Sequence, residues 1–193
     1  MSQPQHFFSI EHAFQVNCEL LPHDAQIPDR AKFDTMIPAP FKLASNINNI
    51  EAQALRPLRN LSESTHDLAE FLNLQSKKID LMMSYILTLG ADDQTRLQGT
   101  SFGGSSVTYL AGEAVELARL VKLKIFIEEN NCAIFCIAKV AACTPQDGQY
   151  GVELNIVMID DEDQEQLVRT SLFIQSVQLK ERATRRQEQG LSS

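Results

Sequence analysis

The sequence carries little positive charge, and this restricts the partners it can bind. Its 193 residues contain 17 Lys and Arg against 25 Asp and Glu, which gives a formal net charge of −8. Binding to nucleic acid is dominated by Lys and Arg contacts with phosphates. We therefore expect no nucleic-acid partner, although a local group of basic residues could still hold a small anion.

Long apolar runs are also missing. No run approaches the length of about 18 residues that a membrane-spanning helix requires. The N-terminal segment has no positively charged region followed by an apolar stretch, which a secretory signal would show. We expect no membrane insertion and a cytoplasmic location.

Motifs typical of enzymes and metal sites are absent as well. The sequence has no phosphate-binding loop, no His and acid cluster with metal-ligand spacing and no nucleophile elbow. Its four cysteines form no Cys-x-x-Cys pair, and the histidines lie far from the cysteine cluster at 132, 136 and 143, which favours buried, reduced thiols over zinc or disulfides. The acidic run at 160–163 suits a helix N-terminus better than a metal site. We expect no enzyme, metal site or resident cofactor.

The strongest pattern that is present is a heptad repeat. Its apolar positions recur at alternating intervals of four and three residues, as in the seam of a coiled coil. A helix over the 29 residues 61–89 is roughly 43 Å long, which exceeds a small domain, so we expect the seam to meet helices of other copies of the chain. The seam residues are Leu61, Thr65, Leu68, Leu72, Gln75, Ile79, Met82, Ile86 and Leu89.

Two further features of this helix bear on its packing. A second apolar line contains Phe71, Leu74, Leu81 and Tyr85. A helix that is apolar on two sides packs on two sides, so we expect one face to contact its own chain and the other a partner. Gln75 interrupts the seam, where it either fixes the register and the number of helices or forms a solvated, loosely packed layer.

The residues around this helix predict strands and a long connection. Alternating apolar residues predict a strand from Phe8 to Leu20. Four prolines in 22–45 favour an extended connection, with a helix capped by Ser45 or Asn46 after it. After Gly90 the pattern predicts strands over 115–127, 132–143 and 150–159, with turns at 128–131 and 144–148, and then a final helix. We expect an antiparallel meander that closes into a small barrel with the first strand.

Five segments together suggest a known family: Phe7-Phe8, Gly99–Gly104, Tyr109–Glu113, Tyr150–Leu154 and Ile159–Arg169. They resemble the PilZ domain, a six-stranded barrel with a C-terminal helix that in many members binds cyclic di-GMP. The long helical insertion is similar to the atypical, tetramer-forming PilZ subgroup. The resemblance implies an α+β, mainly β, single domain with this helix inserted into a PilZ-type barrel. It implies a first strand in 5–21, a Pro-rich connection and oligomerisation helix in 22–90, the other strands in 91–160 and a closing helix in 161–187.

The family's ligand motifs are incomplete in this sequence. PilZ receptors have Arg-x-x-x-Arg before the first strand, and the matching positions here are Gln5 and Ser9. The second motif, Asp or Asn followed by x-Ser-x-x-Gly, matches at Ser101 and Gly104, while Gly99 replaces the acid or amide. For Ser101 and Gly104 a tight turn between strands is the alternative to a ligand role. Arg96 and Arg119 could stand in for the missing arginines, although nothing in their spacing favours them.

The loss of both arginines predicts weak or absent binding of cyclic di-GMP. Arginine matches phosphates and guanine edges through forked donors, and each charge-assisted contact contributes roughly 1.5–3 kcal/mol. The sequence therefore leads to two hypotheses. The first is a non-enzymatic, oligomeric adaptor in bacterial cyclic di-GMP-linked signalling of motility, type IV pili or virulence, with self-assembly into a tetramer and a protein partner. The alternative is a cyclic di-GMP receptor that uses altered contacts.

Overall fold

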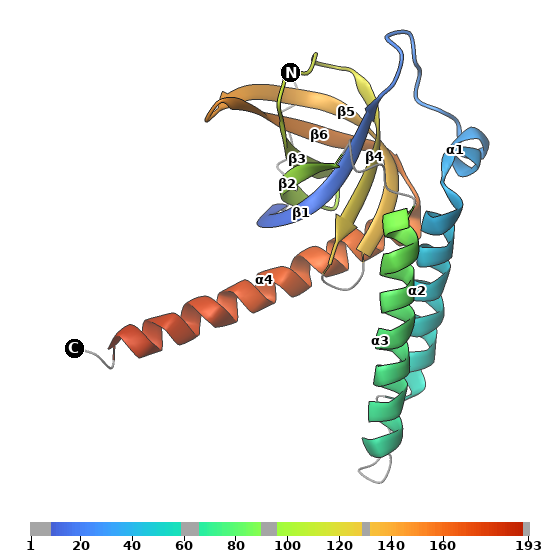
Figure 1. Ribbon diagram of the computed structural model, residues 1–193, viewed down its shortest axis with the longest axis vertical. Helices are drawn as coiled ribbons and strands as arrows, with labels where there is room; N and C mark the ends of the chain where they lie inside the picture. The colour runs from blue at the N-terminus through green and yellow to red at the C-terminus, as the bar shows by residue number, and fades with distance from the viewer. Residues whose placement is uncertain (1–8, 59–65, 90–95, 129–131, 191–193) are drawn as a thin grey trace.

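The computed structural model describes residues 9–58, 66–89, 96–128 and 132–190. A six-stranded barrel carries two helical extensions that leave it in different directions (Figure 1). The helices α2 and α3 contact each other and form one extension, and α4 forms the other. The elements, in chain order, are β1 (Ser9–Leu20), α1 (Arg30–Met36), α2 (Ala39–Leu58), α3 (His66–Leu89), β2 (Arg96–Gly103), β3 (Ser106–Ala111), β4 (Leu120–Ile127), β5 (Cys132–Gln146), β6 (Gln149–Ile159) and α4 (Asp161–Gly190).

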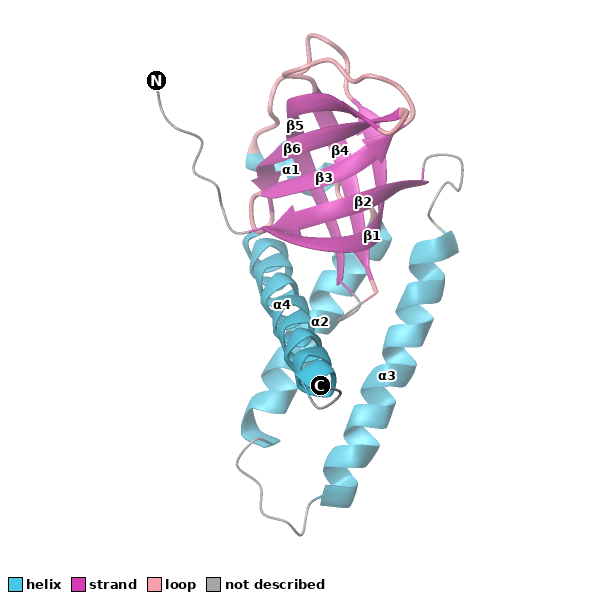
Figure 2. Ribbon diagram, turned by 90° about the vertical axis from the view of Figure 1, so that its left-hand side faces the viewer, coloured by secondary structure: helices cyan, strands magenta, loops and turns pink. Residues whose placement is uncertain are grey.

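The barrel is closed and antiparallel, with the strand order β1-β2-β3-β6-β5-β4 (Figure 2). The expected meander holds for β4, β5 and β6, which pair in chain order, and β4 closes the barrel against the first strand. The chain departs from a simple meander at one point, where β3 pairs with β6 and not with β4. The cause lies in residues 112–119, which form no strand, although a strand was expected from Val115. Ala118 N–H donates to the carbonyl of Val140, so this loop runs to β5 before β4 begins. The closed barrel itself is confirmed.

The connection between β1 and α2 is partly helical, so the expectation of an extended segment over 22–45 was wrong. Asp29 caps α1 by accepting a hydrogen bond from the Lys32 N–H at 2.8 Å. Pro40 occupies the second position of α2. A proline is tolerated in the first helical turn because its missing N–H would have no partner within the helix there. The α2 helix therefore begins several residues before the expected cap at Ser45 or Asn46.

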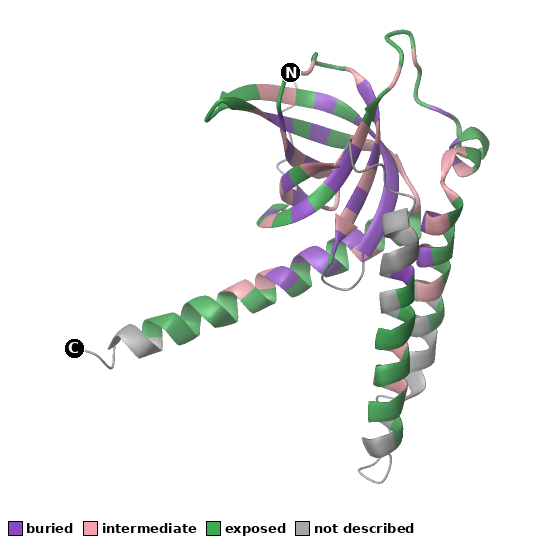
Figure 3. Cartoon of the chain, viewed as in Figure 1, coloured by how far each residue is buried: buried purple, intermediate pink, exposed green. Residues whose placement is uncertain are grey.

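Two hydrophobic clusters share strand β5, which the sequence predicted to be apolar on both faces. Ile134, Cys136 and other side chains of one face lie in the barrel core. Phe135 and Ile137 of the other face pack with Phe33 of α1 and with residues of α2 and α3. This second cluster anchors the α2–α3 extension on the outside of the barrel, where buried residues concentrate near its base (Figure 3).

Candidate functional site

The two ligand-motif segments meet along the β1–β2 ladder. Ser9 lies opposite Gly103, and Glu11 lies opposite Ser101. Gly104 follows the last residue of β2. We call these five residues, Ser9, Glu11, Ser101, Gly103 and Gly104, the signature strip. The structure thus brings together three of the five expected positions, while Gln5 lies outside the described residues.

The signature strip is electrostatically unsuited to an anion. Glu11 is exposed and directly opposite Ser101, and the strip contains no Lys or Arg. A carboxylate in this place repels a phosphate group, and the repulsion grows as the site is desolvated. Sequence reasoning overlooked Glu11, although its position two residues after Ser9 on an alternating strand places both side chains on the same face.

Gly99 belongs to strand β2 and not to the expected turn. A Cβ at this position would lie within 2.6 Å of three carbons of the Phe14 ring. Phe14 is buried and meets Phe102 edge to face, with ring centroids 5.2 Å apart. Gly99 therefore leaves room for an aromatic ring of the barrel core, and its backbone lies opposite Phe14 in the β1–β2 register. This packing accounts for a glycine here without any ligand.

Gly104 and Glu11 both contact helix α4, which lies beside this end of the barrel (Figure 2). A Cβ at Gly104 would lie 2.6 Å from Cγ2 of Val168. The Gln164 side chain donates a hydrogen bond to the Gly104 carbonyl at 3.1 Å. The Gln178 side chain donates to the Glu11 carbonyl at 2.8 Å. The helix is therefore fastened to the signature strip at two points, and Gly104 permits the close approach.

The two arginines considered as replacements lie far from the signature strip. Arg96 pairs with Asn17, eight residues along β1 from Ser9, which is roughly 26 Å at the rise of a strand. Arg119 donates a hydrogen bond to the Leu21 carbonyl at 2.6 Å, beyond the other end of β1. Neither position can complete a site at the strip, so the structure does not support these residues as substitutes.

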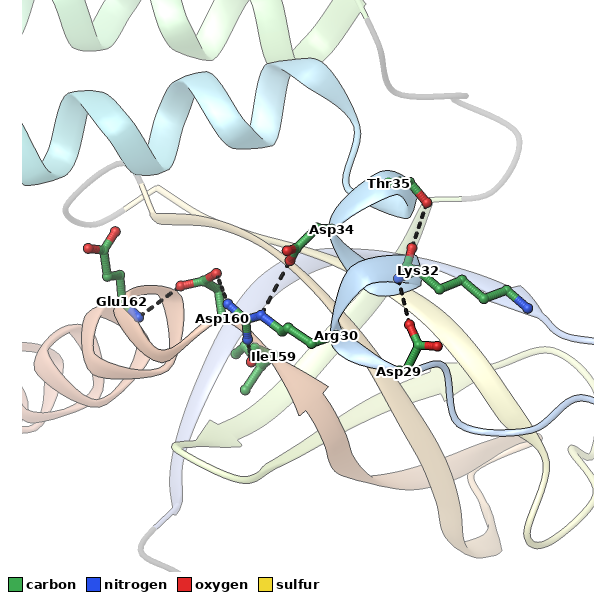
Figure 4. Close-up of polar contacts among 8 residues, drawn as sticks. All are labelled: Asp29, Arg30, Lys32, Asp34, Thr35, Ile159, Asp160 and Glu162. Carbon is green, nitrogen blue, oxygen red and sulfur yellow. Dashed lines mark hydrogen bonds and ion pairs between the residues drawn. The ribbon is translucent and has the colours of Figure 1, made fainter.

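An arginine that the sequence reasoning missed joins α1 to the start of α4 (Figure 4). Arg30 forms ion pairs with Asp160 and with Asp34, the latter at 3.3 Å. It also donates a hydrogen bond to the Ile159 carbonyl at 3.3 Å. The side chain is half exposed, so each ion pair contributes little to stability. We interpret this group as a structural clamp between the helical insertion and the C-terminal helix.

Asp163 is buried in the first turn of α4. Burial raises its pKa from 3.8 to about 6, and a hydrogen bond with Ser45 of α2 opposes this shift. Among the described residues no donor reaches its Oδ1 atom. A buried carboxylate without full hydrogen bonding is costly when ionised. The junction of α2, α4 and the barrel therefore contains a group that titrates near neutral pH.

The cysteine sulfurs are free, and Cys132 and Cys136 are buried. Burial raises the pKa of the Cys132 thiol to about 12 and raises that of Cys136 further. Thiols with raised pKa values are poor nucleophiles and poor metal ligands. Within the described ranges, no group of three His, Cys, Asp or Glu side chains could hold a metal ion, and no helix there is long and apolar enough to cross a membrane.

Helix α3 exposes four of the five seam side chains that the structure describes. Leu68 is 51% exposed, Ile79 is 42% and Met82 is 60%, while Gln75 is also exposed and Leu72 is half-buried. Leu61 and Thr65 lie outside the described residues, and nothing is described of the Ile86 and Leu89 side chains. The seam is thus largely uncovered within one chain.

One contact of α3 with its own chain is made by Met83. Met83 is buried in the second cluster, whereas Phe71 and Leu74 of the second apolar line are 55% and 57% exposed. These two residues of the second apolar line are therefore uncovered within one chain. The hydrophobic pattern of α3 could not distinguish Phe71 and Leu74 from Met83. The side of α3 that contacts its own chain depends on where α2 lies and not on the hydrophobicity of α3 alone.

Comparison with known proteins identifies the fold. No family model matches the sequence, and no curated protein matches it. Among solved structures, a pathogenic protein from Xanthomonas campestris, described as a tetrameric PilZ domain self-assembled via an unusual helical bundle, matches with a TM-score of 0.56. It is 16% identical, and the alignment covers 91% of this chain and 92% of that one. The Bacillus subtilis inhibitor of motility (MotI/DgrA) aligns over 42% of this chain and 41% of its own, with 19% identity and a TM-score of 0.38.

The chain has a PilZ-type fold with a helical insertion. The similarity to the Xanthomonas campestris protein extends over the barrel and the helices together, since nine-tenths of both chains align. The resemblance drawn from the sequence is therefore confirmed at the level of the fold, including the closed barrel and the C-terminal helix. The weaker second similarity adds nothing to this conclusion.

Proposed function

We propose that this protein is a non-enzymatic, oligomeric adaptor of the PilZ type, which assembles through α3 and acts on a protein partner in bacterial signalling linked to cyclic di-GMP. The observation that carries the proposal is the loss of cationic contacts at the ligand motif, since Gln5 and Ser9 stand at its two arginine positions and Glu11 lies opposite Ser101 in the signature strip. A domain that keeps the fold but loses the cationic ligand contacts retains its surfaces for protein binding. The cytoplasmic location stays a prediction.

Self-assembly is supported by the exposed side of α3. The seam residues Leu68, Ile79 and Met82 expose large apolar side chains at heptad spacing, and such a stripe on a long helix is the usual requirement for a coiled coil. The neighbour from Xanthomonas campestris is described as a tetramer formed by a helical bundle. Four chains per assembly is the number we propose by this analogy.

The test of assembly uses charge in the exposed seam. We expect Leu68→Glu together with Met82→Glu to reduce the mass measured by analytical ultracentrifugation, because carboxylates cannot be buried between helices without a large cost. Leu74→Glu is the matched control, since Leu74 is equally exposed but lies on another side of α3. An unchanged mass in the double variant, or an equal loss in the control, would contradict assembly through this seam.

The test of ligand binding is a calorimetric titration with cyclic di-GMP. Loss of two charge-assisted contacts costs about 3–6 kcal/mol, or roughly a hundredfold to ten-thousandfold in affinity. We therefore expect weak or no binding up to high micromolar ligand. The alternative function, a receptor with altered contacts, predicts saturable binding instead, which Ser101→Ala should weaken while a substitution at the distant Arg119 should not.

A further inference from the structure

The outer side of helix α4 has a pattern that the PilZ fold does not explain. The helix contains 30 residues and is therefore about 45 Å long. Leu167 and Ile174 bury its inner side against the barrel. Beyond Gln178 the helix extends clear of the barrel, and residues 179–186 are exposed (Figures 1 and 3). Large apolar residues nevertheless remain on the exposed surface of the helix, with Val168 39%, Leu172 52% and Leu179 57% exposed.

These three residues belong to one continuous stripe with heptad spacing. Its positions follow one another at intervals of four and three residues, so all of them lie on one side of the helix. The middle of the stripe is apolar except for Gln175, its N-terminal end is acidic and its C-terminal end is basic. Every position is exposed in the described part of the chain except Gln175, which is half-buried. The α4 stripe consists of Asp161, Glu165, Val168, Leu172, Gln175, Leu179, Arg182 and Arg186.

We propose that the α4 stripe is a second assembly surface, which pairs antiparallel with the α4 stripe of another copy of the chain. The register follows from the spacing. When Leu172 faces Gln175 of the second copy, Val168 faces Leu179 of that copy. The same antiparallel pairing of positions then continues to the charged residues at both ends of the stripe. Because a two-fold axis relates the two copies, each pair of facing residues occurs twice. The interface is therefore self-complementary and is completed by two copies of the chain.

The charges at the two ends select this direction. In the antiparallel register Glu165 faces Arg182 of the second copy, and Asp161 faces Arg186 of that copy. A parallel pair would place acids beside acids and arginines beside arginines, and like charges at facing seam positions destabilise a coiled coil. Exposed ion pairs contribute little energy singly, so the apolar layers supply the attraction and the charges fix the orientation. This complementarity identifies a second copy as the occupant.

The barrel holds the stripe in a fixed position for such a contact. The hydrogen bonds from Gln164 to Gly104 and from Gln178 to Glu11 fasten α4 to β1 and β2 on both sides of Leu172. Held in this way, the helix leaves Leu172 and Leu179 exposed, while Val168 lies at the edge of the stripe with its Cγ2 beside Gly104 and is still 39% exposed. It is also separate from the α3 seam, because it lies on a different helix that leaves the barrel in another direction (Figure 1).

Disulfide formation tests the orientation directly. Val168→Cys combined with Leu179→Cys should form a dimer on mild oxidation, with position 168 linked to position 179 of the second copy by peptide mapping. Either substitution alone should give no such dimer, because identical positions would be 11 residues apart along the paired helices, or roughly 16 Å, whereas a disulfide needs Cα atoms within about 7 Å. Self-linkage of Val168→Cys alone would show a parallel pair and overturn the proposal.

The disulfide experiment should use protein that also carries Leu68→Glu and Met82→Glu. Because these two substitutions weaken assembly through α3, the association that remains reports pairing through α4. In this background we expect a dimer by ultracentrifugation, and Leu172→Glu should raise its dissociation constant at least tenfold. Ser176→Glu is the control, since Ser176 is exposed on a different side of α4. A monomeric background protein that forms no 168–179 linkage would overturn the α4 proposal and leave the α3 proposal standing.

Discussion

The ring of Phe14 lies against Gly99, in the space that a side chain at position 99 would fill. These two residues face each other across the β1–β2 ladder. The relationship places an aromatic ring of the barrel core next to a position of the ligand motif, where the family has an acid or amide. Any side chain that restored this motif position would therefore compete with the packing of the core.

Gly99→Ala should destabilise the protein by about 1–3 kcal/mol, the range for adding a methyl group to a filled core. The reason is that a Cβ at position 99 would overlap the Phe14 ring, which is buried and already in edge-to-face contact with Phe102. Urea unfolding monitored by circular dichroism measures the effect. Gly112→Ala is the control, because a Cβ there meets nothing within 4 Å. A Gly99→Ala protein as stable as the control would refute the packing explanation.

Restoring the motif should create affinity for cyclic di-GMP. We expect Gln5→Arg with Ser9→Arg to increase affinity roughly a hundredfold or more over the unaltered chain, since each charge-assisted contact contributes about 1.5–3 kcal/mol. The matched variant with Lys at both positions supplies the same charge without the forked geometry and should gain less. Glu11→Gln added to the arginine pair should raise affinity further. If calorimetry gave the same affinity for cyclic di-GMP in all variants and in the unaltered chain, the signature strip would not be the ligand site.

The buried carboxyl of Asp163 should make stability fall as pH rises from about 4 to about 6.5. Its pKa is raised in the folded protein from 3.8 to about 6, so the folded state holds the proton more tightly than the unfolded state in this window. The stabilising contribution is complete below pH 3.8 and is lost as pH rises through 6. Its full size is about 3 kcal/mol, from roughly two pKa units.

Asp163→Asn isolates this contribution. The difference in unfolding free energy between the variant and the unaltered protein should shift in favour of the variant across the same window and level off above about pH 7. Asp161→Asn, an exposed neighbour in the same helical turn, controls for the loss of one negative charge at the helix N-terminus. A pH-independent difference for Asp163→Asn would show that the carboxyl has the same pKa in both states.

Gln75→Leu tests which of its two interpretations holds. If Gln75 lies in a buried layer between subunits, the leucine should raise the melting temperature and broaden the distribution of assembly sizes, because a polar seam residue fixes the number of helices at a cost in stability. Scanning calorimetry and ultracentrifugation at the same concentration measure the two effects. An unchanged melting temperature would place Gln75 in a solvated layer.

The sequence predicted the fold because its strongest signals are local and periodic. The alternation in β1, the double apolar character of β5 and the heptads of α3 each follow from residues that are close in sequence. The sequence did not predict that β3 pairs with β6 and not with β4. The loop between β3 and β4 crosses to β5, where Ala118 hydrogen-bonds to Val140, and no local pattern reveals such a contact. Likewise, the sequence pattern predicted that Pro38 and Pro40 break a helix, although Pro40 lies in the first turn of α2.

The candidate site was predicted only in part. Ser9, Ser101 and Gly104 converge as the motif suggests, since strand pairing determines their proximity. The role of Gly99 required knowledge of which ring covers it, and the roles of Arg30 and Asp163 depend on contacts between α1, α2 and α4 that are distant in sequence. Such contacts carry no periodic signal. The site residues that concern assembly and ligand binding stay predictions.

Strand β5 has a mechanical consequence for the whole molecule. Consecutive side chains of this strand belong alternately to the barrel core and to the cluster beneath the helices, so a single backbone serves as the common wall of both. Force applied to the α2–α3 extension by neighbouring subunits would therefore reach the barrel interior through β5. Melting of this extension and melting of the barrel should accordingly coincide as one cooperative event.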